Sequence, residues 1–211
     1  GIDLAIGSTL ALSMVISATM MKAGIPIGLC VVAALLLGAV FGYINGFVVT
    51  TMKIPAFIAT LGMSGILRGA ALMITDGLPI SSLPDNVAWF GNGRILSIPV
   101  PVLVLLMLAV IFQIILSKTV FGRQIYALGS NHEATRLAGI PVNGRVRYIY
   151  MLSGLLASIA GILLMGRLTG AQPTAAIGYE SNAIAASVIG GASMLGGIGT
   201  VWGAIVGAFI M

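Results

Sequence analysis

Residues Ile25–Val49 read IPIGLCVVAALLLGAVFGYINGFVV, and this stretch decides the environment in which the chain folds. It holds 25 residues without a single Asp, Glu, Lys or Arg, whereas about 18 mostly apolar residues are enough for a helix to cross the hydrocarbon core of a bilayer. A helix that is apolar on every side lies either in lipid or in the core of a large protein. The stretch therefore predicts a membrane span.

The composition of the whole chain agrees with a membrane protein. Hydrophobic residues make up 59% of the sequence and charged residues only 7%, with a mean hydropathy of +1.14. Soluble globular proteins carry about 25% charged residues, so a water-facing globule is excluded. The formal net charge of +5 comes from charges in short loops between apolar spans, where basic residues report orientation in the membrane. We therefore expect no nucleic-acid partner.

Hydropathy and the positions of proline and glycine predict an all-α, polytopic membrane helix bundle with about seven spans, some of them short or broken. The expected spans are Leu4–Met21, Ile25–Val49, Pro55–Ile74, Val100–Leu116, Tyr148–Met165, a short one over Asn182–Leu195 and an unfinished one from Val201. The chain starts at Gly1 without a methionine and stops at Met211 inside a helix-like run. We therefore expect a single transmembrane domain over residues 1–211 that is incomplete at both ends.

The charged residues are concentrated in one segment. Six of the 15 Asp, Glu, Lys and Arg residues lie between Lys118 and Arg147. If residues 117–147 form a cytoplasmic loop, the loops that face inward carry six basic residues and those that face outward carry three, in agreement with the positive-inside rule. The segment Thr75–Ile98 is then an external loop, in which Trp89 and Phe90 are apolar enough to lie at the membrane interface.

Small residues recur at four-residue spacing in several spans, which gives each helix one smooth stripe. The stripes are Gly38, Gly42, Gly46; Gly65, Gly69; Ser153, Ala157, Gly161; and Gly199, Gly203, Gly207. Such stripes let a neighbouring backbone approach closely, and ordinary bundle packing explains them. Movement of helices along these surfaces is the functional alternative.

The charged loop contains the sequence of a short helix. Ser130 and Glu133 have the spacing of a capping box, which predicts that a helix begins at Asn131. Gly139 can end that helix and Pro141 cannot continue it, so the helix covers residues 131–138. It is far too short to cross a membrane. It can serve as a docking element, or it can be an ordinary loop helix at the membrane interface.

The sequence offers no set of metal ligands and no visible catalytic group. His132 is the only histidine and Cys30 the only cysteine, so neither belongs to a set of His and Cys ligands. No nucleophile and base are placed together in the sequence. We expect no catalytic residue, no metal and no cofactor.

Polar residues in or beside the apolar spans are candidates for a translocation pathway, because they are costly in lipid unless they face protein or water. Asp3, next to the first span, can line such a pathway, or it can cap the helix that follows. Ser8 places a hydroxyl just beyond it. Other candidates are Asn45, Arg68 and Gln172, and for Arg68 the alternative is that its side chain extends to the outer membrane interface.

Two long stretches, GRQIYALGSNHEATRLAGI from Gly122 and RYIYMLSGLLASIAGILLMGRLTGAQPTAAIGYESNAIAASVIGGASMLGGIGTVWGAIVGA from Arg147, have a specific resemblance. Together with the opening GIDLAIGSTLAL and the span IPAFIATLGMSGILRGAALMIT, they resemble the permease subunits of bacterial ABC importers for ribose and related monosaccharides. The resemblance covers essentially the whole chain.

The resemblance implies a transport subunit of the bacterial inner membrane that moves a monosaccharide by alternating access. It implies three protein partners: an ABC ATPase, a periplasmic sugar-binding protein and a second permease subunit, which is either an identical copy or a paralogue. The segment Gly122–Gly139 would carry the coupling helix, with Asn131, Glu133, Arg136, Leu137 and Gly139 in contact with the ATPase. The chain has no GxxxxGK[ST] phosphate loop, so ATP hydrolysis is expected in the partner.

Two other functions lack the residues that they would need. An ion-coupled secondary carrier of a small polar solute would need an intramembrane proton or sodium relay, and beyond Asp3 the spans contain no central carboxylate. An intramembrane enzyme would need converging catalytic groups, yet His132 is alone and lies in the charged loop. Neither alternative is favoured.

Overall fold

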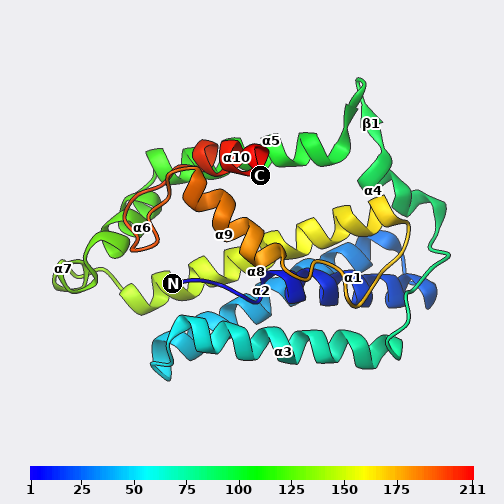
Figure 1. Ribbon diagram of the computed structural model, residues 1–211, viewed down its shortest axis with the longest axis horizontal. Helices are drawn as coiled ribbons and strands as arrows, with labels where there is room; N and C mark the ends of the chain where they lie inside the picture. Colours follow the sequence, from blue (N-terminus) through cyan, green and yellow to red (C-terminus); the bar gives the residue numbers. More distant parts are fainter. The chain divides into compact units, whose positions relative to one another are not determined.

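The structure, a computed structural model, describes all 211 residues, and nearly all of its regular secondary structure is helical (Figure 1). The predicted all-α fold is confirmed. The chain divides into two compact units. The α1 unit contains residues 2–103 and 147–180, and the α6 unit contains residue 1 with residues 104–146 and 181–211.

Helices occur at all seven places where the sequence predicts spans. They are α1 (Ile6–Lys22), α2 (Ile27–Thr51), α3 (Ala56–Thr75), α5 (Val100–Lys118), α8 (Val142–Leu168), α9 (Tyr179–Ile189) and α10 (Val201–Ile210). Four of them, α2, α3, α5 and α8, are long and apolar enough to cross a membrane. Helices α1 and α10 are apolar but shorter.

Proline and residues with positive φ set several helix ends. Pro26 and Pro55 directly precede α2 and α3 in an extended conformation, which a proline ring favours and which suits the residue before a helix. Helix α3 ends at Asp76, whose φ of 50° places it in the left-handed region, and Gly77 follows with a φ of 75°. These punctuation residues explain why the predicted boundaries of α2 and α3 lie close to the observed ones. The predicted boundaries of α8 and α9 are less accurate, since α8 already begins at Val142 and α9 already ends at Ile189.

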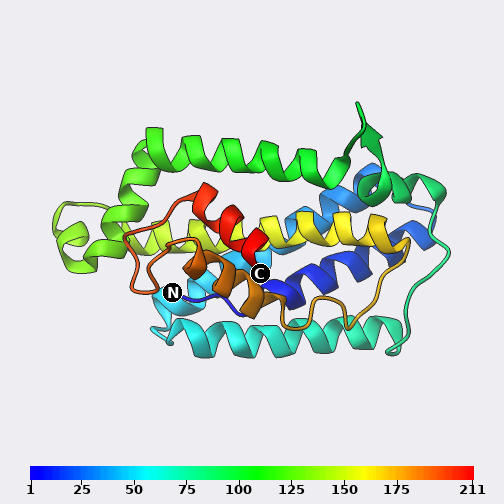
Figure 2. The same cartoon turned by 45° about the horizontal axis from the view of Figure 1, so that its top comes forward.

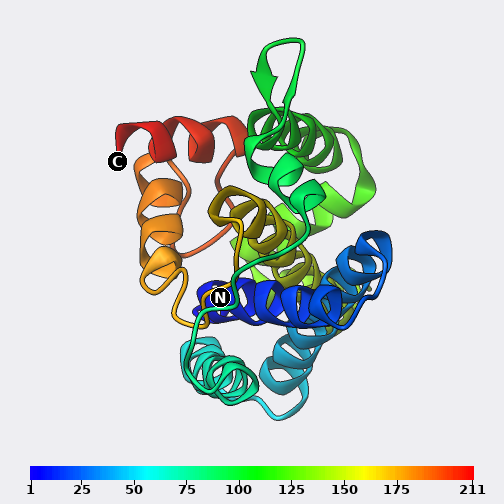
Figure 3. The same cartoon turned by 90° about the vertical axis from the view of Figure 1, so that its right-hand side faces the viewer.

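Helix α1 is the centre of the α1 unit. Twelve of its 17 residues are buried, including Met14 and Val15. Figure 3 shows α1 lying between α3 and α8, and buried Leu67 of α3 and Met165 of α8 belong to the same core cluster. A helix buried on nearly every side contacts protein rather than lipid, so its polar side chains must find partners within the bundle.

Two of the predicted small-residue stripes, those of α2 and α3, differ in their surroundings. A side chain at Gly38 would overlap the Ser158 hydroxyl and the Gly154 backbone, so the stripe of α2 lies directly against α8. The stripe at Gly65 and Gly69 of α3 differs, because nothing lies within 4 Å of either position. The stripe of α3 is therefore not packed against another helix of this chain.

The segment between α3 and α5 was expected to be an external loop, and it contains short regular elements instead. A 3-10 turn, η1 (Asp85–Val87), leads into α4 (Ala88–Asn92), and a small antiparallel hairpin follows, with β1 (Arg94–Ile95) paired to β2 (Ile98–Pro99). Its two turn residues, Leu96 and Ser97, both have positive φ, the geometry of a tight hairpin turn. The sequence has no Asn-Gly or Asp-Gly signal there, which explains why the hairpin was missed.

The α6 unit contains the charged segment up to Val146. The sequence predicted a loop with one short helix there, and the structure has two helices, α6 and α7. Helix α6 (Val120–Ser130) precedes α7 (His132–Leu137), and both are visible in Figure 2. Thr119 begins α6, because its side chain accepts a hydrogen bond from the Gly122 backbone N–H at 3.2 Å. The short helix expected at residues 131–138 corresponds to α7 together with its two capping residues.

Candidate functional site

Asp3 makes two hydrogen bonds but is not the cap of α1, because Ala5 is the residue directly before the helix and no side chain caps it. One carboxylate oxygen accepts a hydrogen bond from the Ala5 backbone N–H at 3.0 Å, just before α1 begins. The other accepts from the Ser153 hydroxyl of α8 at 2.7 Å. Asp3 therefore orders the entry into α1 and also joins this entry to α8.

A polar stripe on α3 faces the same region. Thr60, Ser64 and Arg68 recur at four-residue spacing and so share one face of the helix. The Thr60 hydroxyl donates to the Ala56 carbonyl of its own helix at 2.8 Å and lies 3.4 Å from the Ile2 carbonyl. The Ser64 and Ser8 hydroxyls lie 2.8 Å apart. This spacing was visible in the sequence, but only Arg68 was singled out from it.

Arg68 binds backbone groups of this chain. One of its terminal nitrogens, Nη1, donates hydrogen bonds to the Pro173 carbonyl at 2.6 Å and to the Ala175 carbonyl at 2.7 Å. The guanidinium group thus holds the irregular segment between α8 and α9 against α3.

These contacts define a polar seam in the α1 unit, consisting of Asp3, Ser8, Ser64, Arg68 and Ser153. Two of the predicted pathway residues, Asn45 and Gln172, lie outside it. Gln172 is next to Pro173, to which Arg68 binds, but its own side chain is exposed. Asp3, Ser8 and Arg68 each form a hydrogen bond between two segments of the α1 unit, whereas Asn45 and Gln172 do not.

Asn45 lies fully buried in α2, with 2% of its surface exposed, and its side-chain oxygen has no hydrogen-bond partner. It is next to Gly46, which packs against the backbone of Arg147 in α8. One turn along α8, Tyr150 is also buried, and its hydroxyl likewise lacks a partner. Buried polar groups are rarely left unpaired. Tyr150 was not predicted, because nothing in the sequence distinguishes it from an interfacial tyrosine.

Further along α1, two more serines form polar contacts with other helices. The Ser13 and Ser158 hydroxyls lie 2.6 Å apart, and Ser17 donates to the Cys30 carbonyl at 3.2 Å. All three serines are buried. Helix α1 is therefore joined to α8 and α2 by hydroxyl groups as well as by its apolar core.

In the α6 unit, α7 has defined ends and an exposed apolar residue. The Asn131 side chain caps α7 by accepting a hydrogen bond from the Ala134 backbone N–H at 2.9 Å. Gly139 takes the left-handed conformation that follows a helix, with a φ of 78°. Leu137, at the end of α7, is 82% exposed. The helix therefore presents an apolar side chain outside this chain's own core.

The predicted capping box is wrong by one residue. Ser130 ends α6, and Asn131 is the capping residue of α7. Glu133 then lies two residues after the cap rather than three, so it does not reach back to the cap. It forms an exposed ion pair with Arg136 at 3.1 Å instead. Asparagine and serine are both good caps, so the sequence alone did not separate the two registers.

The sequence of the chain matches a known protein family. Residues 1–211 match the family described as branched-chain amino acid transport system / permease component. The chain belongs to this family. It is therefore a transport subunit and a multi-pass protein of the inner membrane.

Three known permeases are similar in sequence to this permease component. The ribose import permease protein of Haemophilus influenzae is 44% identical over 100% of the chain, and that of Escherichia coli K12 is 45% identical. The L-arabinose transport system permease protein of E. coli K12 is 39% identical over 99% of the chain. The chain spans 67% of the ribose permeases and 64% of the arabinose permease. No solved structure matches it.

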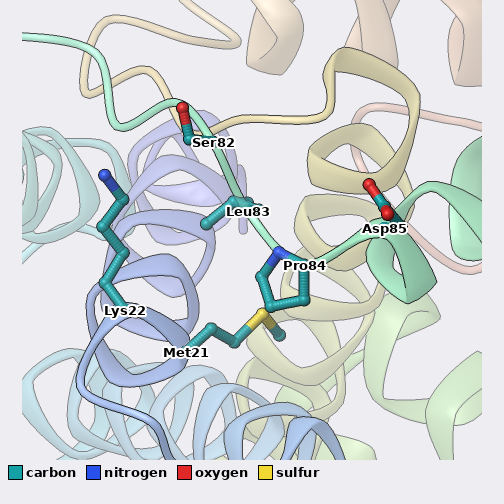
Figure 4. Close-up of a pocket in the computed structure, with 6 residues that line it drawn as sticks. All are labelled: Met21, Lys22, Ser82, Leu83, Pro84 and Asp85. Carbon is teal, nitrogen blue, oxygen red and sulfur yellow. The ribbon is translucent and has the colours of Figure 1, made fainter.

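The permease also has one shallow hollow that sequence reasoning did not find. It lies where the end of α1 meets the connection between α3 and α4, and Figure 4 shows Lys22 and Asp85 on opposite sides of it. The full lining is Met21, Lys22, Ser82, Leu83, Pro84 and Asp85. Lys22 and Asp85 form no ion pair there, and the hollow lies apart from the polar seam.

Proposed function

We propose that the permease moves a monosaccharide of the ribose type across the bacterial inner membrane by alternating access. The observation that carries this proposal is the identity of 44% and 45% to two ribose import permeases over the whole chain. A separate ABC ATPase supplies the energy, and a periplasmic sugar-binding protein delivers the substrate. A second permease subunit, identical or paralogous, completes the pathway.

The chemistry of the polar seam supports a sugar as the substrate. A carboxylate only accepts hydrogen bonds, whereas serine hydroxyls both donate and accept. Asp3, Ser8 and Ser153 together therefore suit a molecule covered with hydroxyl groups.

We assign the translocation pathway to Asp3, Ser8 and Arg68, with Asn45 and Gln172 as further candidates. Asn45 supports the assignment because its buried side-chain oxygen has no partner in the protein. A group of that kind gains a hydrogen bond when a polar substrate or a water molecule reaches it. Tyr150 joins the set for the same reason.

Helix α7 is the proposed contact with the ATPase, through Asn131, Glu133, Arg136, Leu137 and Gly139. Its two capped ends make it stiffer than a loop, and its exposed Leu137 offers an apolar anchor. The exposed Glu133–Arg136 ion pair contributes little to stability. In this proposal the two charged side chains instead provide polar contacts at the edge of the docking surface.

The substrate class is tested by uptake in proteoliposomes. The full-length permease is reconstituted with its ATPase and binding protein, and uptake of radiolabelled ribose is measured with an excess of unlabelled ribose, arabinose or leucine outside. We expect unlabelled ribose to abolish the signal and leucine to leave it unchanged. Uptake of labelled leucine without uptake of any pentose would contradict the proposal and favour the amino acid named in the family description.

A further inference from the structure

The loop between α9 and α10, residues 190–200 with the sequence GGASMLGGIGT, has a defined structure. We call it the glycine loop. The Ser193 N–H donates to the Ile198 carbonyl at 3.0 Å, and the Gly196 N–H donates to the Ser193 carbonyl at 3.0 Å. Gly196 and Gly197 have φ angles of 99° and 78°, which residues with a side chain rarely adopt. The glycine loop is therefore a folded turn rather than a slack connection.

One face of α6 holds the glycine loop. The Tyr126 hydroxyl donates a hydrogen bond to the Gly199 carbonyl at 2.6 Å. Gly129 lies one turn further along the same face of α6, and a side chain there would overlap the backbone nitrogen of Gly197. The backbones of α6 and the glycine loop therefore touch, and only glycine at position 129 permits this contact.

Asn131 joins α6 to α7 without a flexible linker. Its backbone N–H donates to the Ala127 carbonyl at 2.9 Å and so closes the last turn of α6. Its side chain accepts from the Ala134 N–H at 2.9 Å and so opens α7. Because a single residue closes one helix and opens the next, a force on α7 acts directly on α6.

On its other side, the glycine loop is attached to α9 and α10. Thr200 caps α10 by accepting from the Gly203 N–H at 3.0 Å, and the Gln113 side chain of α5 accepts from the Val201 N–H at 3.2 Å. Side chains at Gly203 or Gly207 would overlap the backbone of α9 at Gly190 or Ala186. Any displacement of the glycine loop therefore also displaces the start of α10 and the end of α9.

We propose that Tyr126 and Gly129 are positioning residues that carry the movement of α7 to the glycine loop, and that α6, α7 and the glycine loop move as one body during transport. The inference rests on the proposed function, because it needs an ATPase that acts on α7. What supports it is an unbroken series of short contacts from Asn131 through Tyr126 and Gly129 to Thr200. A contiguous network still requires evidence of energetic coupling, which the following experiment supplies.

The test uses the full-length permease in proteoliposomes with its ATPase and binding protein. Tyr126→Phe removes one hydroxyl and keeps the ring, and Tyr148→Phe is its control on an exposed tyrosine of α8. Gly129→Ala adds one methyl group, and Gly144→Ala is its control, since nothing lies within 4 Å of that position. The readout is the number of ribose molecules imported for each ATP hydrolysed, together with the melting temperature of each purified variant.

We expect Tyr126→Phe to lower the ratio of ribose to ATP by about three- to tenfold. This is the change in an equilibrium constant that corresponds to the loss of one hydrogen bond. Gly129→Ala should lower it at least as much, with ATP hydrolysis retained and both controls unchanged. An unchanged ratio in both variants overturns the inference. A melting temperature that falls while the ratio stays constant also overturns it, because the contact would then be merely structural.

A third variant separates this inference from the proposed function. Asn131→Ala removes the cap of α7 itself. If Asn131→Ala lowers the ratio while Tyr126→Phe and Gly129→Ala do not, α7 couples to the ATPase but the route through the glycine loop is wrong. If the unmodified permease shows no ATP-dependent uptake, the proposed function fails and the inference fails with it.

An engineered disulfide between α6 and the glycine loop tests whether the two move as one body. A side chain at Gly197 would place its Cβ atom 3.2 Å from the Cβ of Ser130, close to the separation of about 3.5–4.5 Å in disulfides. Cysteine is strained at the φ of 78° of Gly197, so the reduced form of the same variant is the reference. Cys30 is buried and does not interfere. We expect the oxidised Ser130→Cys, Gly197→Cys variant to import ribose as well as its reduced form. Loss of uptake on oxidation, reversed by a reductant, would show that the contact opens and would overturn the inference.

Discussion

At the scale of single residues, Asp3 and Ser153 show how distant parts of the chain meet. They are 150 positions apart, and the Ser153 hydroxyl donates to the Asp3 carboxylate at 2.7 Å. A hydrogen bond to a charged group contributes more than one between neutral groups, about 1.5–3 kcal/mol against about 1. This bond joins the segment before α1 to the middle of α8. A substitution at Asp3 therefore weakens the attachment of both helices to each other.

Replacing Asp3 by Asn tests its place in the pathway. Asn keeps the size of the side chain and one acceptor oxygen but loses the charge, so its hold on Ser153 and on sugar hydroxyls weakens. We expect ribose uptake to fall by about tenfold, as a loss of about 1.4 kcal/mol implies. Uptake is measured in proteoliposomes that contain equal amounts of folded permease.

The matched control for Asp3→Asn is Asp76→Asn. Asp76 is exposed at the end of α3 in the left-handed conformation, which asparagine also adopts readily. This variant should transport ribose like the unmodified protein. Equal uptake by Asp3→Asn and Asp76→Asn would remove Asp3 from the pathway.

Some of these residues could be found from sequence and others could not. Thr60, Ser64 and Arg68 repeat every four positions, and this helical spacing is enough to indicate that they share a face. The pairing of Asp3 with Ser153 has no such signal, because it depends on how α1 packs against α8. The cap at Asn131 is a local feature, yet it was placed one residue early because Ser130 satisfies the same rule.

At the scale of elements, apolar length was the dominant signal. Each predicted span corresponds to a helix, because the cost of exposing backbone groups to lipid leaves a helix as the solution for a single apolar segment. Helix α6 was missed, because an 11-residue helix with an arginine and two glycines has no comparable signal. The β1–β2 hairpin was missed for a similar reason, since each of its strands has only two residues.

Two glycines of different helices should respond to alanine with opposite signs. An added methyl group at Gly42 of α2 would overlap the Tyr150 carbonyl of α8, and such overpacking costs about 1–3 kcal/mol. At Gly65 of α3 the methyl group meets nothing within 4 Å. There the better helix propensity of alanine should stabilise the fold by up to about 1 kcal/mol.

The melting temperatures of the purified Gly42→Ala and Gly65→Ala variants in detergent check this pair. The packing of α2 on α8 predicts a lower value for Gly42→Ala and an equal or higher value for Gly65→Ala. Equal loss in both variants would mean that α3 is packed as tightly as α2, against the arrangement described above.

At the scale of the whole molecule, we propose that two features of the permease have separate tasks. The polar seam of the α1 unit has the donors and acceptors that a sugar needs, and α7 of the α6 unit has the capped, exposed form that a docking element needs. Family membership could be expected from the sequence, because long stretches of the chain resemble sugar permeases. The partners are proposals, because they lie outside this chain.

The source of energy is the most direct test of this account. Ribose uptake is measured in proteoliposomes that contain the full-length permease, with and without its ATPase, under either an ATP supply or an imposed proton or sodium gradient. We predict uptake only when the ATPase, ATP and the binding protein are all present, with no response to either gradient. Uptake driven by an ion gradient in the absence of the ATPase would contradict the account and identify the protein as an ion-coupled carrier.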